Sequence, residues 1–565
     1  MASLIQSFRS ACWARPLPGA QGSYLVWKVI PLPIADCHPV TVAPGMSRLF
    51  LDFCSGDPAA LHFYGGPTAG QWQKRPSLPS HWSAIVDILE QQNPAPSAAA
   101  SIQVLRQGAG TIVTGQQVGL FGGPLFTSFK IATALARARE ASAAGKPHVG
   151  IFWLASEDHD FAEINHVTFP ARRELRKVVY GPAPEGAVPV GGILLDGPIG
   201  PLLEQAGQLI GPSEALDALH EAYQPGRTFA QAFAAFYARA FAAQGLLILD
   251  ASSRAVHRLG AAVLREAIDR AGEFNARLLE RNRELAAAGY HAQVAVADNS
   301  SLLFLLDEKT GARVALKRVP QSADEPDGLW QAGHDRYSSA DLIGILESEP
   351  ERVSPSALLR PVFQDYLLST SLTIGGPAEI AYFAQSQVLF DQILSRMTPV
   401  QPRLSATIIE PDIAELLRRH ELGLDRVFAE TQDGLAQLLA ARALPIEGKR
   451  KLAAAGNSLD GELTRLQEWM HAMDEGLGRS GDAAASKIRY QMDRLRRLAA
   501  DFQMQKETSL AKHAQAIHNA LFPGGQSQER VHGAAWYFAR HGFELSAMLV
   551  ERASEGCAGH IGLWA

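Results

Sequence analysis

The chain has 565 residues, of which 47% are hydrophobic and 19% are charged, and its 52 Lys and Arg against 58 Asp and Glu give a net charge of −6. At roughly 100–200 residues per domain, this length predicts about three to five structural units with enough apolar residues for a large core. The small negative charge argues against nucleic-acid binding, which requires a basic face. Disordered and low-complexity classes are excluded by the same composition.

The four cysteines are Cys12, Cys37, Cys54 and Cys557. They lie far apart and form no CxxC pair, so we expect neither a zinc knuckle nor a disulfide framework. This usage indicates a reducing compartment, and we expect a cytoplasmic protein. Every stretch of 18 mostly apolar residues contains a charge, so we also expect no membrane-spanning helix and no contact with a membrane.

Residues 1–45 are expected to be an extension translated ahead of a functional start at Met46, where ordinary folded-domain sequence begins. Within this extension, the apolar stretch Tyr24–Ile30 follows two arginines, as in a signal peptide. Lys28 interrupts the stretch, however, and no Ala-x-Ala cleavage site is present. We therefore expect no secretion signal.

Residues 46–410 alternate short apolar runs with helical stretches, which is typical of a parallel sheet with crossover helices. The run VGIFWLA is continuous, as in a strand that helices cover on both faces. Two stretches, about 167–198 and 294–350, are expected to be inserted antiparallel subdomains. The predicted core strands are Thr111–Thr114, Val149–Ala155, Leu246–Asp250 and a strand near Ser371–Ile374.

Residues 411–525 are predicted to form a helical arm. Apolar side chains recur in steps of four and three over Leu459–Leu477 and again over Ile488–Phe502, as in a coiled coil. The sequence GRSGD at Gly478–Asp482 separates the two runs and predicts the turn of an antiparallel hairpin. We expect this arm to form a homodimer; the alternative is a hairpin that packs only on its own domain. Residues 526–565 are expected to pack back on the core.

A strand, a glycine-rich loop and a helix start follow one another in TIVTGQQVGLFGGPLFTSFK. Pro124 is predicted at the first helical position, where its missing N–H has no consequence. The free N–H groups and the positive dipole at such a helix start suit an anionic group. The pattern is neither GxGxxG nor a P-loop, and a tightly packed turn is the alternative. The candidate binding residues are Thr114, Gly115, Gln116, Gln117, Gly119, Gly122 and Gly123.

Acidic residues and histidines follow the predicted strand Val149–Ala155 in the sequence SEDHDFAEINH. The carboxyl ends of parallel strands form the ligand crevice, particularly where the strand order reverses. A carboxylate beside His159 would favour the imidazolium, which suits an acid or a phosphate contact. The alternative is that Asp158 or Asp160 caps the next helix, and the spacing matches no standard metal site. The candidates are Glu157, Asn165 and, as catalytic residues, Asp158, His159, Asp160 and His166.

A third strand-to-helix turn, SLTIGGPAEIAYFAQ, again places glycines and a proline before a helix. Glu379 and Tyr382 are three residues apart, so both side chains could reach the same crevice. Further along, Arg403 suits a clamp on a carboxylate or a phosphate, and a packed turn is the alternative. The candidate binding residues here are Gly375, Gly376, Glu379, Tyr382 and Arg403.

Five segments together resemble the bacillithiol synthase family, the cysteine ligases of bacillithiol biosynthesis. They are TGQQVGLFGGPLFTSFK, FWLASEDHDFAEINHV, IGGPAEIAYFAQ, PVQPRLSATIIEP and LFPGGQSQERVHGAAWYFARHG, in this order from about Met46 onward. The resemblance implies a Rossmann-like core similar to the nucleotidyltransferase and class I aminoacyl-tRNA synthetase superfamily. It also implies connecting-peptide insertions in that core and a C-terminal coiled coil that forms the dimer.

The same resemblance implies a reaction that joins L-cysteine to the amine of glucosaminyl-malate and yields the thiol bacillithiol. Forming an amide from a free carboxylate in water requires an activated acyl group, so we expect ATP with Mg²⁺ and an adenylate. The chain lacks the HIGH and KMSKS signatures of class I synthetases. An acyl donor that arrives already activated is therefore the alternative.

Under this hypothesis the loop Thr114–Gly123 holds substrate or phosphate, and Gly375–Glu379 completes the opposite wall. His159 and His166 stabilise charge on the transferred group. The carboxylates of Glu157, Asp158 and Asp160 bind the cysteine ammonium, the sugar hydroxyls or Mg²⁺. Two other functions remain open: a metal-dependent hydrolase or sugar-modifying transferase that uses the Glu157–Asp160 cluster, and a scaffold organised by the coiled coil.

Overall fold

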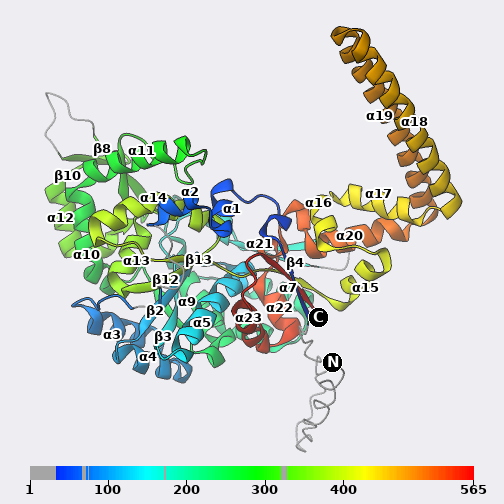
Figure 1. Cartoon of the computed structure of the whole chain (residues 1–565). Coiled ribbons are helices and arrows are strands. Elements are labelled where there is room, and N and C mark those ends of the chain that lie inside the picture. Colours follow the sequence, from blue (N-terminus) through cyan, green and yellow to red (C-terminus); the bar gives the residue numbers. More distant parts are fainter. Residues whose placement is uncertain (1–33, 66–71, 74, 171–173, 320–327) are drawn as a thin grey trace, which may run out of the picture.

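The computed structural model describes residues 34–65, 72–73, 75–170, 174–319 and 328–565 (Figure 1). The apolar stretch weighed above as a signal peptide lies outside these residues. Among the described residues, no helix combines the length and the apolar character that a bilayer-spanning segment needs.

A parallel five-stranded sheet in the order β13-β12-β2-β3-β6 forms the centre of the molecule. All seven residues of β3 are buried, because helices cover both faces of the sheet. The parallel α/β core predicted from the sequence is therefore confirmed. The strands are β2 (Gly110–Gln116), β3 (His148–Leu154), β6 (Leu247–Asp250), β12 (Thr370–Gly375) and β13 (Val400–Pro402).

The strand order reverses between β2 and β12. From β2 the chain passes through α5 (Phe126–Ala143) to β3 and later to β6, all on one side of β2. It returns to the other side with β12, α14 (Pro377–Leu394) and β13. Both α5 and α14 thus begin at the carboxyl ends of the two strands that flank the reversal, where open α/β sheets bind ligands.

Side chains on β3 and β6 alternate between two apolar clusters, one on each face of the sheet. On β3, Ile151 and Trp153 belong to one cluster, whereas Phe152 and Leu154 belong to the other. The helices between and around the strands that have not yet been named are α1 (Arg48–Ser55), α2 (Pro58–Leu61), α3 (Trp82–Gln92), α4 (Ala99–Arg106), α6 (Phe161–Ile164), α7 (Ile199–Ile210), α8 (Glu214–Ala222), α9 (Phe229–Ala240), α10 (Arg254–Asp269), α11 (Ala271–Ala287) and α13 (Arg360–Leu368).

Two antiparallel units leave this core. The first is the hairpin of β4 (His166–Pro170) and β5 (Leu175–Val179). The second is a five-stranded sheet in the order β10-β9-β8-β7-β11. Its elements are β7 (Ser300–Leu306), β8 (Arg313–Arg318), β9 (Leu329–Ala332), β10 (Asp335–Ser338), α12 (Ser339–Ser348) and β11 (Val353–Pro355).

The two ends of the described chain meet in a third sheet. Here β15 (His560–Trp564) pairs antiparallel with β1 (Ile34–His38) and parallel with β14 (Ser405–Ile409). A disulfide joins Cys37 to Cys557, and Cys54 is a free thiol. Two expectations are therefore wrong. Residues from β1 onward belong to the fold rather than to an extension that ends at residue 45. A disulfide also exists, because the sheet brings together cysteines from opposite ends of the sequence.

The helical arm projects from the body as a long hairpin of α18 (Ile446–Met473) and α19 (Glu475–Lys506) (Figure 1). Its base and the segment that follows it consist of α15 (Pro411–His420), α16 (Leu424–Ala429), α17 (Gln432–Ala443), α20 (Ser509–Leu521), α21 (Gln528–Val531), α22 (Ala534–His541) and α23 (Glu544–Ser554). The last of these helices packs against α5 of the core.

The hairpin turns at Asp474, not at the predicted Gly478–Asp482. Asp474 caps α19, since its carboxylate accepts the N–H of Leu477 at 2.9 Å. The glycines instead lie inside α19 and face α18. A Cβ at Gly478 would lie 2.2 Å from His471 Nδ1, so a larger residue would not fit there. The glycines permit close helix packing rather than a turn, which a spacing argument could not distinguish.

Candidate active site

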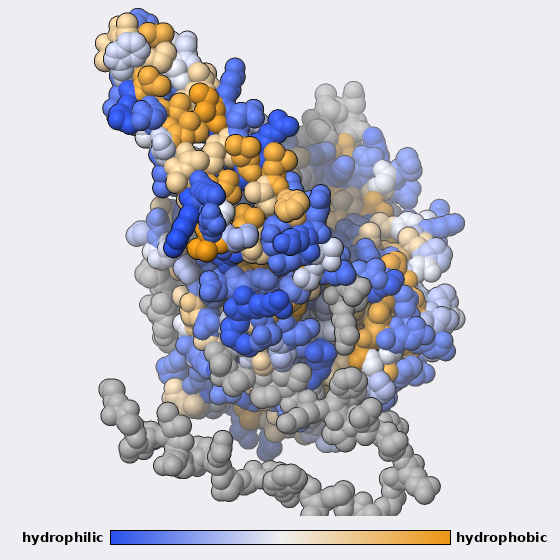
Figure 2. All heavy atoms as spheres, turned by 90° about the vertical axis from the view of Figure 1, so that its right-hand side faces the viewer, coloured by the Kyte–Doolittle hydropathy of each residue, from blue (hydrophilic) through white to orange (hydrophobic). Residues whose placement is uncertain are grey.

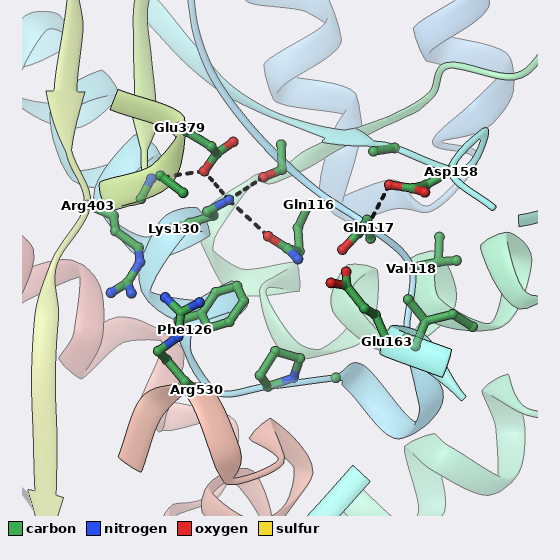
Figure 3. Close-up of a pocket in the computed structure, with 18 of the residues that line it drawn as sticks. Gln116, Gln117, Val118, Phe126, Lys130, Asp158, Glu163, Glu379, Arg403 and Arg530 are labelled. Carbon is green, nitrogen blue, oxygen red and sulfur yellow. Dashed lines mark hydrogen bonds and ion pairs between the residues drawn. The ribbon is translucent and has the colours of Figure 1, made fainter. Parts of the chain in front are cut away.

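A pocket of about 660 Å³ opens where the strand order reverses (Figure 3). The loop after β2, the loop after β3 and the first turn of α14 form its walls, and side chains from α5, α6, α13 and the C-terminal segment complete it. Of the residues proposed from the sequence, eleven line it: Gly115, Gln116, Gln117, Gly119, Gly123, Asp158, His166, Gly376, Glu379, Tyr382 and Arg403.

Three predicted loop residues support the walls from behind. The Thr114 hydroxyl donates a hydrogen bond to the Ile374 carbonyl at 2.9 Å and so links β2 to β12. Gly122 has a φ of 82°, which favours glycine, and its N–H donates to the Tyr223 hydroxyl at 3.0 Å. Gly375 is the last residue of β12 and lines a different cavity. These three act as structural residues.

Glu157 and His159 also lie outside the pocket. Glu157 Oε1 is 2.7 Å from Nε2 of the buried His257. Burial opposes the charge of His257, but the Glu157 carboxylate outweighs this effect and raises the pKa of His257. His159 Nδ1 lies 3.3 Å from Arg313 Nη1, and its ring contacts Phe304 of the second sheet. The structure therefore separates these two candidates from the other residues after β3.

The capping alternative applies to Asp160. Its carboxylate accepts the N–H of Glu163 at 3.2 Å and caps α6. Asn165 likewise has a structural partner, because its Nδ2 donates to the Tyr180 carbonyl at 3.0 Å. Neither residue lines the pocket.

Asp158 and His166 are the two proposed catalytic residues that do line the pocket. Gln117 Nε2 donates to one carboxylate oxygen of Asp158 at 2.6 Å, and the other oxygen accepts the N–H of His159 at 2.6 Å. Burial, together with the nearby Lys177, lowers the pKa of His166, so its imidazole is neutral at pH 7. The pocket thus holds an oriented carboxylate and a neutral imidazole.

Lys130 on α5 lines the pocket and is a candidate site residue that the sequence analysis missed. Its side chain is only 5% exposed and forms an ion pair with Glu379. Its ammonium also donates to the Gly115 carbonyl at 2.7 Å and to Gln116 Oε1 at 2.9 Å. Burial lowers the pKa of Lys130, and the Glu379 carboxylate opposes that shift. A lysine within the otherwise buried helical run SFKIATALA was the signal available in the sequence.

Cationic groups gather around the ring of Phe126 (Figure 3). The distances to the ring centroid are 5.8 Å for Lys130 Nζ, 5.3 Å for Arg403 Cζ and 6.0 Å for Arg530 Cζ. Asp158 and Glu163 lie on the other side of the pocket. The pocket therefore has a cationic end and an acidic end.

Arg360 adds a fourth cation to the wall. It hydrogen-bonds the Tyr382 hydroxyl, and its Nη2 is 3.8 Å from Glu379 Oε1. Glu379 also accepts the Gly376 N–H at 2.9 Å, at the start of α14. This carboxylate therefore positions two cations, Lys130 and Arg360, and the helix start at once.

Arg403 is held from behind by Glu529, which belongs to the C-terminal segment and was not foreseen. Both side chains are buried, and Arg403 Nη2 lies 2.6 Å from Glu529 Oε1. Arg403 Nη1 donates to the Leu404 carbonyl at 2.7 Å, whereas the buried Nε has no hydrogen-bond partner among the described residues. Despite burial, the guanidinium lowers the pKa of Glu529, so the pair is charged.

In the part of the chain that the structure describes, no three His, Cys, Asp or Glu side chains are placed together to hold a metal ion. The acidic residues after β3 instead have separate partners. Glu157 pairs with His257, Asp158 with Gln117, and Asp160 with the start of α6.

Comparison with known families gives two matches that together span most of the chain. Residues 36–404 match a family model described as bacillithiol biosynthesis BshC, N-terminal Rossmann-like domain. Residues 406–561 match its companion, bacillithiol biosynthesis BshC, C-terminal coiled-coil domain. The first match begins within β1, in agreement with the folded position of that strand.

Curated proteins with the name "Putative cysteine ligase BshC" are similar over nearly their whole length. One from Koribacter versatilis is 37% identical over 92% of this chain and 98% of its own. One from Solibacter usitatus is 34% identical over 92% of this chain and 97% of its own. A third, from Salinibacter ruber, is 30% identical over 87% of this chain and 92% of its own.

The buried pair of Arg403 and Glu529 generates a stability prediction. Glu529→Gln leaves a buried guanidinium without its counter-charge, which costs about 3–5 kcal/mol, so the melting temperature should fall markedly. Removing both charges in Arg403→Met/Glu529→Gln should cost less than the single change. Thermal unfolding followed by circular dichroism measures both variants. Independent, additive losses in the double variant would contradict the coupling.

Proposed function

This chain belongs to the bacillithiol biosynthesis BshC family, and on that premise we propose that it joins L-cysteine to the amine of glucosaminyl-malate, the last step of bacillithiol biosynthesis. Its place in a family of cysteine ligases makes it an enzyme of the ligase class. The observation that carries the finer proposal is the pocket at the strand reversal, which has a cationic and an acidic end.

The two ends match the two ends of the proposed acceptor. The malyl group of glucosaminyl-malate carries two carboxylates, and guanidinium groups bind carboxylates through paired N–H donors. Arg403 and Arg530, beside Phe126, are the proposed contacts for this group. Lys130 is already paired with Glu379, so its role is to hold the wall in shape.

The amines of the two substrates then fall at the acidic end. Asp158 and Glu163 line that end and suit the ammonium of cysteine and the hydroxyls of the sugar. An amine becomes a nucleophile only after it loses a proton, and the attacking nitrogen must lose another as the amide forms. The neutral imidazole of His166 is the proposed acceptor for such a proton.

The cysteine carboxylate requires activation, and ATP with Mg²⁺ is the proposed co-substrate. The cationic end suits phosphate oxygens as well as carboxylates. Mg²⁺ is commonly held by one or two carboxylates together with phosphate oxygens, so Asp158 and Glu163 could hold it without a larger cluster. A cysteine donor that arrives already activated is the alternative.

The hydrolase or sugar-transferase hypothesis required Glu157, Asp158, His159 and Asp160 to act as one cluster. In the described structure Glu157 pairs with His257 and Asp160 caps α6. Only Asp158 Oδ1 and His159 Nδ1 stay close, 3.9 Å apart, so the four side chains do not form one cluster. The scaffold hypothesis does not account for a pocket with this arrangement of charge.

The reaction itself tests the proposal. The purified protein is incubated with glucosaminyl-malate, isotopically labelled cysteine and Mg²⁺, with and without ATP, and products are identified by mass spectrometry. We expect labelled bacillithiol only with ATP, and at least tenfold less with His166→Gln, because general-base groups contribute about 10²–10⁴-fold. Product without ATP would remove the nucleotide but keep the ligase, whereas no product in either reaction would contradict the proposed reaction.

Arg530 allows the anion site to be tested without disturbing the core, because its side chain is exposed at the pocket. Arg530→Gln should raise the KM for glucosaminyl-malate about tenfold, since a charge-assisted hydrogen bond contributes about 1.5–3 kcal/mol. The KM for cysteine should change little. Arg277→Gln, an arginine on α11 outside the pocket, is the matched control. Equal effects of Arg530→Gln on both substrates would refute its role in the malyl site.

We also propose that the protein forms a homodimer through the hairpin of α18 and α19. Six of the eleven predicted heptad residues are exposed, and only Leu463 is buried between α18 and α19. Leu463 is 6% exposed, whereas Leu466, Trp469 and Phe502 are 53%, 59% and 67% exposed. Figure 2 shows hydrophobic side chains along this projecting hairpin. Such a stripe is typical of an interface, and a second copy would bury it.

Charge introduced into the stripe should separate the copies. The double variant Trp469→Glu/Phe502→Glu should elute as a monomer of about 61 kDa in size-exclusion chromatography with light scattering, where the unmodified protein gives twice that mass. Gln491→Glu/Gln505→Glu adds the same charge at exposed polar positions of α19 and serves as the control. A dimer that survives the first variant would place the interface elsewhere.

A further inference from the structure

A second cavity, of about 410 Å³, adjoins the first. Its lining includes Cys557, which forms a disulfide with Cys37. Its walls come from the N-terminal helix α1, the start of α14 and the C-terminal segment that ends in β15. The two cavities share Pro377 and Arg403, so they meet at the first turn of α14. Among the residues that line this second cavity, Arg403 alone has a part in the proposed ligase reaction.

The lining of this cavity combines arginines with apolar side chains. Arg137, Arg403 and Arg552 line it, and none of its lining residues is a carboxylate. Each arginine has a carboxylate partner outside the lining, which fixes its position: Glu140, Glu529 and Glu555. The apolar lining includes Val40, Met46, Phe50 and Phe53, and the free thiol of Cys54 also lines the cavity. A small anion with some apolar surface fits this combination.

Arg403 supplies an observation of its own. Its side chain is only 4% exposed, and its Nε has no hydrogen-bond partner among the described residues. A buried N–H without a partner is unfavourable, and Arg403 lies where the two cavities meet.

The disulfide joins two cysteines that are not buried. Cys37 is exposed and Cys557 is partly exposed, and the sulfur of Cys557 accepts the Gly559 N–H at 3.4 Å. Thiol exchange at a disulfide requires access for an attacking thiolate and a leaving sulfur that can carry negative charge. Cys557 faces the cavity, and Cys37 faces solvent, where water can stabilise the departing thiolate.

We propose that this second cavity binds an anionic low-molecular-weight thiol and presents it to the Cys37–Cys557 disulfide for exchange. The thiolate sulfur forms a bond to Sγ of Cys557, the Cys37–Cys557 bond breaks, and its electron pair leaves on Sγ of Cys37, which then takes a proton from water. A second thiol attacks the mixed disulfide and frees Cys557. Overall, two thiols are oxidised to their disulfide and the protein disulfide is reduced.

The natural thiol is the dicarboxylate product of the ligase reaction, and this identification alone rests on the proposed function. Because Arg403 lies in both cavities, a thiol carboxylate bound to it would compete with the malyl contact in the first cavity. The second cavity would thereby report the level of the product to the site that makes it.

The test uses full-length protein purified without reductant, and it requires no ligase activity. Mercaptosuccinate, a thiol with two carboxylates, is compared with the uncharged 2-mercaptoethanol. Each rate of disulfide opening is divided by the rate of the same thiol with hydroxyethyl disulfide, which corrects for intrinsic reactivity. Samples are quenched with N-ethylmaleimide and mapped by peptide mass spectrometry.

We expect the corrected rate to be about tenfold higher for mercaptosuccinate, because a cationic cavity concentrates the anion. This preference should shrink as salt rises from about 0.05 to 0.5 M, whereas the 2-mercaptoethanol rate should not change. The quenched intermediate should carry the mercaptosuccinyl group on Cys557 and maleimide on Cys37.

Arg552→Gln should reduce the preference several-fold. Arg418→Gln is the matched control, since Arg418 forms the same i,i+3 pair with a glutamate on an outlying helix. The salt series gives the answer even if Arg552→Gln does not fold. Three results would each overturn the proposal. They are free Cys37 and Cys557 thiols in the purified protein, equal corrected rates for the two thiols, and a mercaptosuccinyl adduct on Cys37. A protein that passes this test but makes no bacillithiol would contradict only the ligase reaction.

Discussion

The buried ammonium of Lys130 is the interaction on which the candidate site depends. Placing a charge at 5% exposure carries a desolvation penalty of several kcal/mol unless acceptors surround it. Those acceptors come from the loop after β2 and from Glu379 on α14, so the ion pair ties together the two strands between which the sheet reverses. Glu379 also contacts Arg360 and accepts the Gly376 N–H at the start of α14, so it positions these groups as well. This arrangement fixes the wall of the pocket where the loop after β2 meets α14.

The C-terminal segment is part of the site rather than an appendage to the arm. Glu529 lies beyond the coiled coil in sequence, yet it fixes Arg403 beside the pocket. Arg530, next to it in sequence, faces the pocket itself. The same segment continues into β15, whose pairing with β1 brings the disulfide next to the second cavity. One stretch of chain therefore couples the cationic end of the first pocket, the second cavity and the disulfide.

The arm illustrates how one sequence pattern can serve two interfaces. A heptad repeat predicts only that apolar residues face something. Gly478 and Gly481 let α19 approach α18 closely, and this close packing buries Leu463 while Leu466 and Phe502 stay exposed. Leu463 packs inside the hairpin, and the exposed apolar residues are the ones that we propose a second copy covers. The turn was predicted at the glycines because glycine favours both turns and close packing, and the sequence does not distinguish the two.

The sequence by itself determined the elements whose signal is local. Runs such as VGIFWLA fixed the central strands, and the glycine and proline turns after β2 and β12 placed two walls of the pocket correctly. Local pattern also gave Arg403 and Asp158, because charged residues next to strand ends meet at one edge of a parallel sheet. Only the tertiary structure decided which charged residues share a pocket. The packing of distant segments is what brings Lys130, Arg530 and Glu529 to the site. Glu157 and His159 instead contact His257 and Arg313. A contact between residues far apart in sequence depends on how whole helices and strands pack. The spacing of residues along the chain therefore cannot predict such a contact.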